Sequence, residues 1–153
     1  MIENNHIFLI DSNILIYAYD KSESVKNTIA EKILEDVFTN KKNAAISTQN
    51  LSEFFVNITS KIEMPISITE ARHIIQEIIS MSNIKTVTIG ENTILKAIDI
   101  SSEFETSYWG ALISAVMHEN KINKIITENE KDFKKIPWLK VVNPFKEHSD
   151  SIR

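Results

Sequence analysis

The stretch 7-IFLIDSN-13 decides the expected fold, because a short run of apolar residues ends abruptly in polar ones. A run that is apolar at every position, rather than at alternate positions, is typical of a strand covered on both faces. Further β-like runs, most of them also continuously apolar, follow at residues 44–48, 85–89, 124–127 and 140–143. The sequence therefore predicts a buried sheet of about five strands.

Stretches with apolar residues at helical spacing separate these runs. Their apolar positions are Val25, Ile29, Ile33 and Val37; Leu51, Phe55, Ile58 and Ile62; Ile74, Ile75, Ile78 and Ile79; and Ile94, Leu95 and Ile98. Strands that alternate with helices predict an α/β fold with a parallel sheet and helices on both faces. Two successive helices, at about 50–63 and 68–81, would form a hairpin after the second strand and a candidate partner surface. Residues 111–117 are apolar nearly all round, which predicts a buried helix.

The composition is that of one ordered domain, with 153 residues, 42% of them hydrophobic, 25% charged, 2 Gly and 3 Pro. We expect a single domain over residues 1–146 and a C-terminal tail over 147–153. The chain has no cysteine, which excludes disulfides and thiolate metal sites and suits a reducing compartment. It also lacks a signal-peptide pattern and an apolar run near the roughly 20 residues of a bilayer span. The expected location is cytoplasmic, with no membrane partner.

The formal charge of −4 argues against a protein that holds nucleic acid on a broad basic surface. It does not exclude a nuclease, because bound divalent cations reverse the local sign of an acidic site.

Polar side chains follow several of the expected strands, at the edge where ligands bind in open α/β sheets. Asp11 follows the first strand, Glu53 lies on the helix after the second and opposite its apolar side, and Thr127 and Asn129 follow the fourth. Taken singly, Asp11 could cap a helix and Glu53 could be a solvated surface residue. Together, oxygen ligands of this kind suit Mg²⁺ or Mn²⁺, which predicts metal-dependent phosphodiester hydrolysis.

Four motifs, "IFLIDSNILIYAYD", "STQNLSEFF", "SYWGALISAVM" and "IITENEKDF...VVNPF", together resemble PIN-domain ribonucleases, particularly the VapC-like toxins of toxin–antitoxin pairs. The resemblance runs from about Ile7 to Phe145. It implies a three-layer α/β/α fold with a helical hairpin after strand two, and a cytoplasmic endoribonuclease that uses Mg²⁺ or Mn²⁺ on single-stranded or loop RNA. It also implies a cognate antitoxin protein and a homodimer.

The resemblance assigns roles to particular residues, with two departures. Asp11 and Glu53 match two of the four acids of the family site and would be the metal ligands. Asn13 and Thr127 match its supporting polar residues. The third acid would fall at Gly110 and the fourth at Asn129, so this form is expected to be a weakened or inactive nuclease.

Helix stability gives no reason for Gly110, since glycine costs about 1 kcal/mol relative to alanine inside a helix and Asp is favoured near a helix N-terminus. Three explanations stay open. The protein could be a natural pseudoenzyme that acts as a PIN-like module binding protein or RNA, or a toxin disabled by a substitution in the cloned copy. Alternatively, one of the loop acids Glu128, Glu130 and Asp132 could reach across the cleft and supply the missing charge.

Two other readings concern function and exposed aromatics. A receiver-like signalling domain would need a phosphate-accepting Asp after the third strand, where the chain reads "TVTIGEN".

Single-stranded RNA could stack on exposed aromatic side chains. The candidates are Tyr17, Tyr19, Tyr108, Trp109 and Trp138, although Tyr108 and Trp109, in "YWGALI", are expected mainly in the core.

Overall fold

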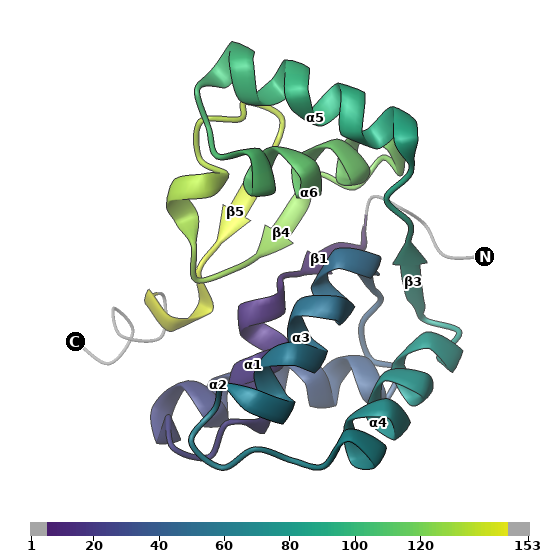
Figure 1. Ribbon diagram of the computed structural model, residues 1–153, viewed down its shortest axis with the longest axis vertical. Coiled ribbons are helices and arrows are strands. Elements are labelled where there is room, and N and C mark those ends of the chain that lie inside the picture. Colours follow the sequence, from purple (N-terminus) through teal and green to yellow (C-terminus); the bar gives the residue numbers. More distant parts are fainter. Residues whose placement is uncertain (1–5, 147–153) are drawn as a thin grey trace.

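The computed structural model describes residues 6–146, which form a parallel sheet between two sets of helices (Figure 1). The strands are β1 (Phe8–Ile10), β2 (Ala44–Ser47), β3 (Ile84–Val87), β4 (Lys124–Ile126) and β5 (Lys140–Val142). The helices are α1 (Ser12–Tyr19), α2 (Ser24–Phe38), α3 (Thr48–Ser60), α4 (Ile68–Ser80), α5 (Glu91–Phe104), α6 (Tyr108–Glu119) and the short 3-10 helix η2 (Glu130–Asp132). The expected tail, 147–153, lies outside the described residues.

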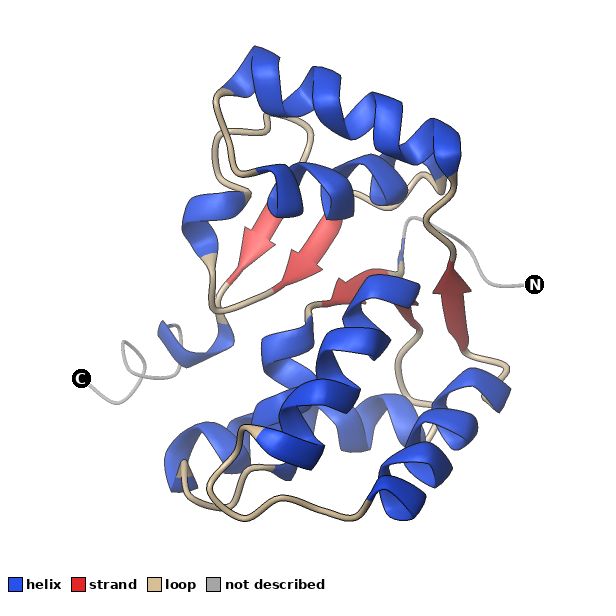
Figure 2. Cartoon of the chain, in the orientation of Figure 1, coloured by secondary structure: helices blue, strands red, loops and turns tan. Residues whose placement is uncertain are grey.

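The sheet has five parallel strands in the order β3-β2-β1-β4-β5, which confirms the predicted architecture (Figure 2). β1 lies at the centre, where Leu9 is in register with Ala45 of β2 and Ile125 of β4. The chain builds outward from β1 to β3 on one side and from β4 to β5 on the other. The strand order thus reverses between β1 and β4, and in open α/β sheets a crevice for ligands opens beyond the carboxyl ends of such strands.

Helices cover both faces of the sheet, with α1 to α4 on one side and α5 and α6 on the other (Figure 1). Alternate residues of a strand point to opposite faces. Phe8 and Ile10 of β1 accordingly pack into the core under α1 to α4, and Leu9 packs into the core under α6. This burial on both sides is the reason that the β1 sequence is apolar at every position.

The hairpin of α3 and α4 and the buried helix α6 also match the predictions. Every residue from 110 to 117 is buried. Trp109, expected in the core, is 64% exposed, because its side chain borders a surface hollow lined by Gln49, Ser52 and Glu53. No helix within the described range is long and apolar enough to cross a membrane.

In α5, the buried side of the helix is not the side that the sequence predicted. The expected apolar stripe at Ile94, Leu95 and Ile98 is exposed, and the helix instead buries Ala97 and Ile100. The reason is that α5 packs on α6 rather than on the sheet, and the core they share includes small residues that let the two helices approach. The apolar stripe of α5 therefore remains on the surface of the chain.

Candidate active site

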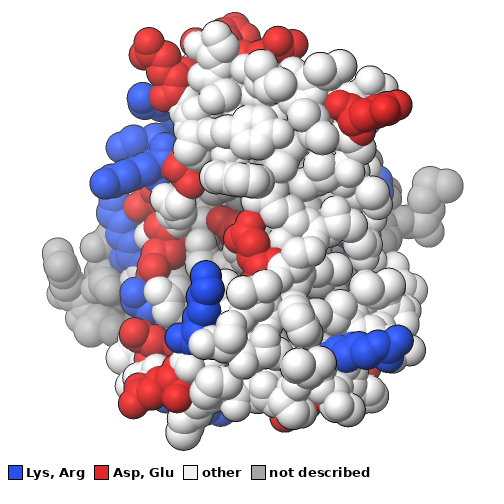
Figure 3. All heavy atoms as spheres, viewed as in Figure 1, with Lys and Arg blue, Asp and Glu red and all other residues white. Residues whose placement is uncertain are grey.

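A small polar cavity of about 160 Å³ opens beyond the carboxyl ends of the central strands. Its lining residues are Asp11, Ser12, Asn13, Gln49, Glu53, Trp109, Gly110, Ile113, Asn129, Asp132 and Phe133. The space-filling view shows acidic atoms at a hollow near the middle of this face (Figure 3). Of the residues that the family resemblance matched to the site, namely Asp11, Asn13, Glu53, Gly110, Thr127 and Asn129, only Thr127 is not in the lining, and it is buried and hydrogen-bonded to Asp11. The structure thus brings all of these residues together.

Asp11 is the most tightly held side chain of the cavity. Its Oδ1 accepts hydrogen bonds from the backbone N–H of Ser12 at 2.8 Å and from Nδ2 of Asn50 at 3.2 Å. Its Oδ2 accepts from Oγ1 of Thr127 at 2.7 Å and from Nδ2 of Asn13 at 3.4 Å. Asp11 also caps α1, so the capping role considered from the sequence is real and coexists with a place in the cavity.

The surroundings of Asp11 disfavour its charge. Burial raises the pKa of its carboxyl above the usual value, while hydrogen bonds from Thr127 and Ser12 lower it. The neighbouring carboxylates of Glu53 and Asp132 raise the pKa further. A bound cation would reverse this balance, because it favours the ionised form of nearby carboxyls.

Glu53 is joined to Asp11 through Ser12. The Ser12 hydroxyl donates to Oε2 of Glu53 at 2.7 Å, and Nε2 of Gln49 donates to Oε1 at 2.7 Å. Glu53 lies on the exposed side of α3, opposite the buried Leu51, as the helical spacing predicted. The hydrogen bonds hold this exposed carboxylate against the cavity.

The opposite wall of the cavity is formed by the start of α6 and by the η2 segment. Ser107 caps α6 by accepting from the N–H of Gly110 at 3.1 Å. The backbone N–H of Asn129 donates to Oγ1 of Thr127 at 2.9 Å, and Nδ2 of Asn129 donates to Oδ2 of Asp132 at 2.5 Å. Two of the four expected acids are therefore absent from this wall, and Asp132 is the carboxylate that lies there.

The other two loop acids point elsewhere. Glu128 accepts a hydrogen bond from the Tyr17 hydroxyl at 2.7 Å and forms an ion pair with Lys26 at 2.7 Å. Glu130 accepts from Nδ2 of Asn143 at 3.4 Å. Neither lines the cavity.

The residues of the cavity fit a divalent cation held by few protein ligands. Among residues 6–146, no three His, Cys, Asp or Glu side chains lie close enough together to hold a metal ion. Mg²⁺, however, is commonly bound by one or two carboxylates together with water and substrate phosphate. Asp11 and Glu53 provide such a pair, and Oε1 of Gln49, which is buried, has no donor within the described part of the chain. The donor set suits an ion that keeps much of its water.

Three contributors to the site were not identified from the sequence: Ser12, Gln49 and Asn50. Asn50 could have been noticed, because it stands three residues after the helix cap Ser47, and its side chain accepts from the Ser47 N–H at 3.1 Å as well as reaching Asp11. The link from Ser12 to Glu53 joins residues that are 41 positions apart and has no local signal.

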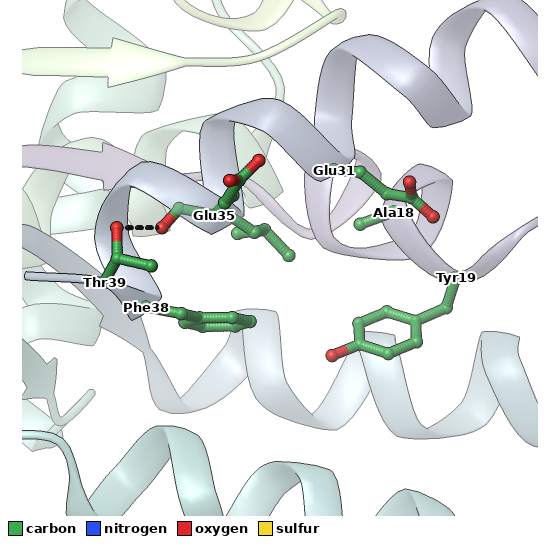
Figure 4. A pocket seen from close by; sticks show the side chains of 7 residues that line it. Ala18, Tyr19, Glu31, Glu35, Phe38 and Thr39 are labelled. Carbon is green, nitrogen blue, oxygen red and sulfur yellow. Dashed lines mark hydrogen bonds between the residues drawn. The ribbon is translucent and has the colours of Figure 1, made fainter.

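A second hollow, of about 310 Å³, lies between the end of α1 and α2 (Figure 4). It is lined by Ala18, Tyr19, Glu31, Leu34, Glu35, Phe38 and Thr39. Burial raises the pKa of the Tyr19 hydroxyl, and the negative charges of Glu77, Glu31 and Glu70 raise it further. None of the residues around Asp11 borders this hollow, so its apolar, acid-flanked surface suits contact with a protein rather than chemistry.

Comparisons with known proteins agree with this geometry. The family model of the PIN domain matches residues 8–139. Among solved structures, a toxin–antitoxin complex from Klebsiella pneumoniae aligns with a TM-score of 0.62 and 25% identity, over 90% of this chain and 97% of that one. VapBC2 from Rickettsia felis, bound to a promoter DNA fragment, aligns with a TM-score of 0.62 and 20% identity, over 90% of this chain and 98% of that one.

A more distant neighbour is VapC20 from Mycobacterium tuberculosis, described as a toxin that cleaves the sarcin-ricin loop. It aligns with a TM-score of 0.58 and 13% identity, over 78% of this chain and 86% of that one. A search among curated proteins found no match.

Proposed function

The chain belongs to the PIN domain family, and from that premise we propose that it is a VapC-like, metal-dependent endoribonuclease toxin, weakened by the neutral residues Gly110 and Asn129. The observation that carries the proposal is the pairing of Asp11 with Glu53 through Ser12, whose backbone N–H donates to Asp11 and whose hydroxyl donates to Glu53, at the mouth of the central strands. Two carboxylates from distant parts of the chain would repel each other there without a cation.

Asp11 and Glu53 would hold Mg²⁺ or Mn²⁺, which when bound supplies an activated water and neutralises charge that develops on a phosphodiester. The protein residues orient this pair. Thr127, Asn13 and Asn50 fix the Asp11 carboxylate in one rotamer. Because water would be the nucleophile, no side chain forms a covalent intermediate.

Single-stranded or loop RNA suits the surface beside the cavity. Trp109 stands exposed at its edge, and with Gln49, Ser52 and Glu53 it borders an adjoining hollow of about 500 Å³. Single-stranded bases stack on aromatic side chains without strong sequence preference. Trp109 would therefore hold a base next to the phosphodiester presented to Asp11 and Glu53.

Protein partners are the second part of the proposal. A cognate antitoxin is supported by the toxin–antitoxin neighbours, and the apolar, acid-flanked hollow of Figure 4 is a surface that a basic segment with apolar side chains would fit. A homodimer is supported by the exposed stripe Ile94, Leu95 and Ile98 on α5. Light scattering of the protein and of a Leu95→Glu variant would test the dimer, which the charged residue should dissociate.

A catalytically inactive PIN-like module that binds RNA or protein is the alternative function. The observation in its favour is the neutral pair Gly110 and Asn129, where the family resemblance places acids.

RNA cleavage assays separate the two functions. We expect the purified chain to cleave single-stranded RNA slowly with Mg²⁺ or Mn²⁺, and the Asp11→Asn variant to be inactive. Asp99→Asn, which removes the same charge from the exposed side of α5, is the matched control and should keep full activity. RNA binding without cleavage at any Mn²⁺ concentration would favour the alternative.

A further inference from the structure

The space beside Gly110 is already filled. A Cβ placed on Gly110 would lie 2.7 Å from the carbonyl oxygen of Asp132, 2.8 Å from Cβ of Asp132 and 3.1 Å from Oγ of Ser107. Contacts below 3.0 Å to backbone are not tolerated without movement. At Gly90, by contrast, a Cβ would have no described atom within 4 Å, other than those of the adjacent residues and of its own helix backbone. Of the two glycines, only Gly110 is required by a close approach.

Independent contacts hold the η2 segment against the start of α6. The Thr106 hydroxyl donates to the carbonyl oxygen of Asp132 at 2.8 Å, and Asn129 donates to its carboxylate. The next residue, Phe133, is buried in the core under α6. The Asp132 backbone is thus anchored over Gly110 from both sides.

We propose that Gly110 and Asp132 form a coupled pair, in which glycine lets η2 close onto α6 and Asp132 supplies the negative charge that an acid at position 110 would otherwise bring. The inference deepens the proposed function and rests on it, since it concerns the same cation site. It favours the loop-acid explanation, and among the three loop acids it selects Asp132.

Asp132 would not bind the ion directly as a third protein ligand, because no three acidic or histidine side chains of residues 6–146 lie close enough to hold an ion together. Its charge would act on the ion through intervening water. Asp132 nevertheless lies at the site, since it lines the same cavity as Asp11 and Glu53. Glu128 is neutralised by Lys26 and cannot play this part.

The coupling changes what a Gly110→Asp variant should do. In a disabled toxin, restoring the acid would raise the affinity for Mn²⁺. In this structure the new Cβ would push the Asp132 backbone away, so one carboxylate would be gained near the cavity while another was displaced. We expect no gain in Mn²⁺ affinity from this substitution.

Calorimetric titration of the full chain with Mn²⁺ tests the inference. Asp132→Asn should weaken Mn²⁺ binding by about tenfold, within the range for groups that act on a metal through its surroundings. Glu130→Gln removes the same charge from the same 3-10 helix and should leave the affinity within about twofold, and Asp132→Glu should retain most of it. Equal affinities for Asp132→Asn and Glu130→Gln, or tighter Mn²⁺ binding by Gly110→Asp, would overturn the proposal.

Thermal unfolding tests the close approach itself. Helix propensity alone predicts that Gly110→Ala raises the Tm, whereas the contact with Asp132 predicts that it lowers the Tm. A raised Tm contradicts the coupling. If Asp11→Asn abolishes Mn²⁺ binding and Asp132→Asn does not weaken it, the inference fails and the proposed function stands. If the unmodified chain binds no Mn²⁺, both fail.

Discussion

The two walls of the cavity are built differently. One, the β1–α3 wall, consists of Asp11, Ser12, Gln49 and Glu53, and hydrogen bonds from Ser12 to Glu53 and from the buried Asn50 of α3 to Asp11 hold it together. The other, the α6–η2 wall, consists of Gly110, Asn129 and Asp132, and its one carboxylate comes from a short 3-10 helix.

The difference shows which part of the site depends on side chains and which on the backbone. In the β1–α3 wall, donors from four residues fix Asp11, so single substitutions of the acids should have simple, large effects. In the α6–η2 wall, the position of Asp132 depends on how closely two backbone segments approach at Gly110. Substitutions there should act through geometry as well as charge.

The largest effect is expected for Asp11→Asn, which would break the β1–α3 wall at its centre. Mn²⁺ affinity and RNA cleavage should fall by at least about 100-fold, because loss of a ligand exceeds the roughly 10–100-fold cost of changing an outer group. Calorimetry and an RNA cleavage assay measure the two quantities, with Asp99→Asn as control. Retention of both would remove Asp11 from the site.

Glu53→Gln should have the next largest effect, on the order of tens-fold in Mn²⁺ affinity, since the side chain keeps its shape and loses its charge. The same calorimetric titration measures it. A loss no larger than that of Glu130→Gln would mean that Glu53 is an ordinary surface residue, as its exposure alone suggests.

Trp109→Ala removes the α6 side chain at the cavity edge without changing the charge of the site. RNA affinity should fall by about tenfold, since stacking of one base contributes roughly 1–3 kcal/mol, while Mn²⁺ affinity should not change. Fluorescence anisotropy with a labelled RNA measures the first quantity. Trp109→Phe should restore most of the affinity, and equal weakening by both variants would argue against stacking.

Ser12→Ala tests the link within the β1–α3 wall and should weaken Mn²⁺ binding by several-fold to about tenfold, because Glu53 loses the hydroxyl that orients it. The control for calorimetry is Ser52→Ala. Ser52 is an exposed serine of α3, one residue before Glu53, and within the described chain its hydroxyl donates only to the Thr48 carbonyl. Equal affinities for the two variants would show that the Ser12 bond does not matter.

The smallest effect is expected from pH. A carboxyl must lose its proton to bind a cation, and burial raises the pKa of Asp11 above the usual value. Mn²⁺ affinity should therefore be complete above this raised pKa and decrease as the pH falls through it, at a higher pH than for an ordinary aspartate. Titrations at a series of pH values measure the onset, and an affinity that declines only near the usual pKa of aspartate would contradict the burial argument.

The sequence predicted the β1–α3 wall better than the α6–η2 wall for a physical reason. Asp11 directly follows a continuously apolar strand, and Glu53 lies opposite a buried helical stripe, so local periodicity places both. The parallel sheet then brings the strand ends to one edge. The fold and the charged half of the site therefore follow from local patterns.

The α6–η2 wall depends on contacts that no local pattern encodes. The approach of the Asp132 carbonyl to Gly110 joins segments 22 residues apart and is set by the anchors at Thr106 and Phe133. The same holds for Leu95, whose exposure follows from the packing of α5 on α6 rather than on the sheet. The family resemblance placed an acid at position 110 and left Asp132 as one of three candidate loop acids, but no local pattern indicated that the Asp132 backbone packs against Gly110.

A crystal of the protein soaked in Mn²⁺, with the anomalous difference density examined, tests most directly whether the cavity is a cation site. An ion held as proposed gives a peak between the carboxylates of Asp11 and Glu53. A cavity without anomalous density, while Mn²⁺ occupies acidic residues elsewhere on the surface, would contradict the proposal.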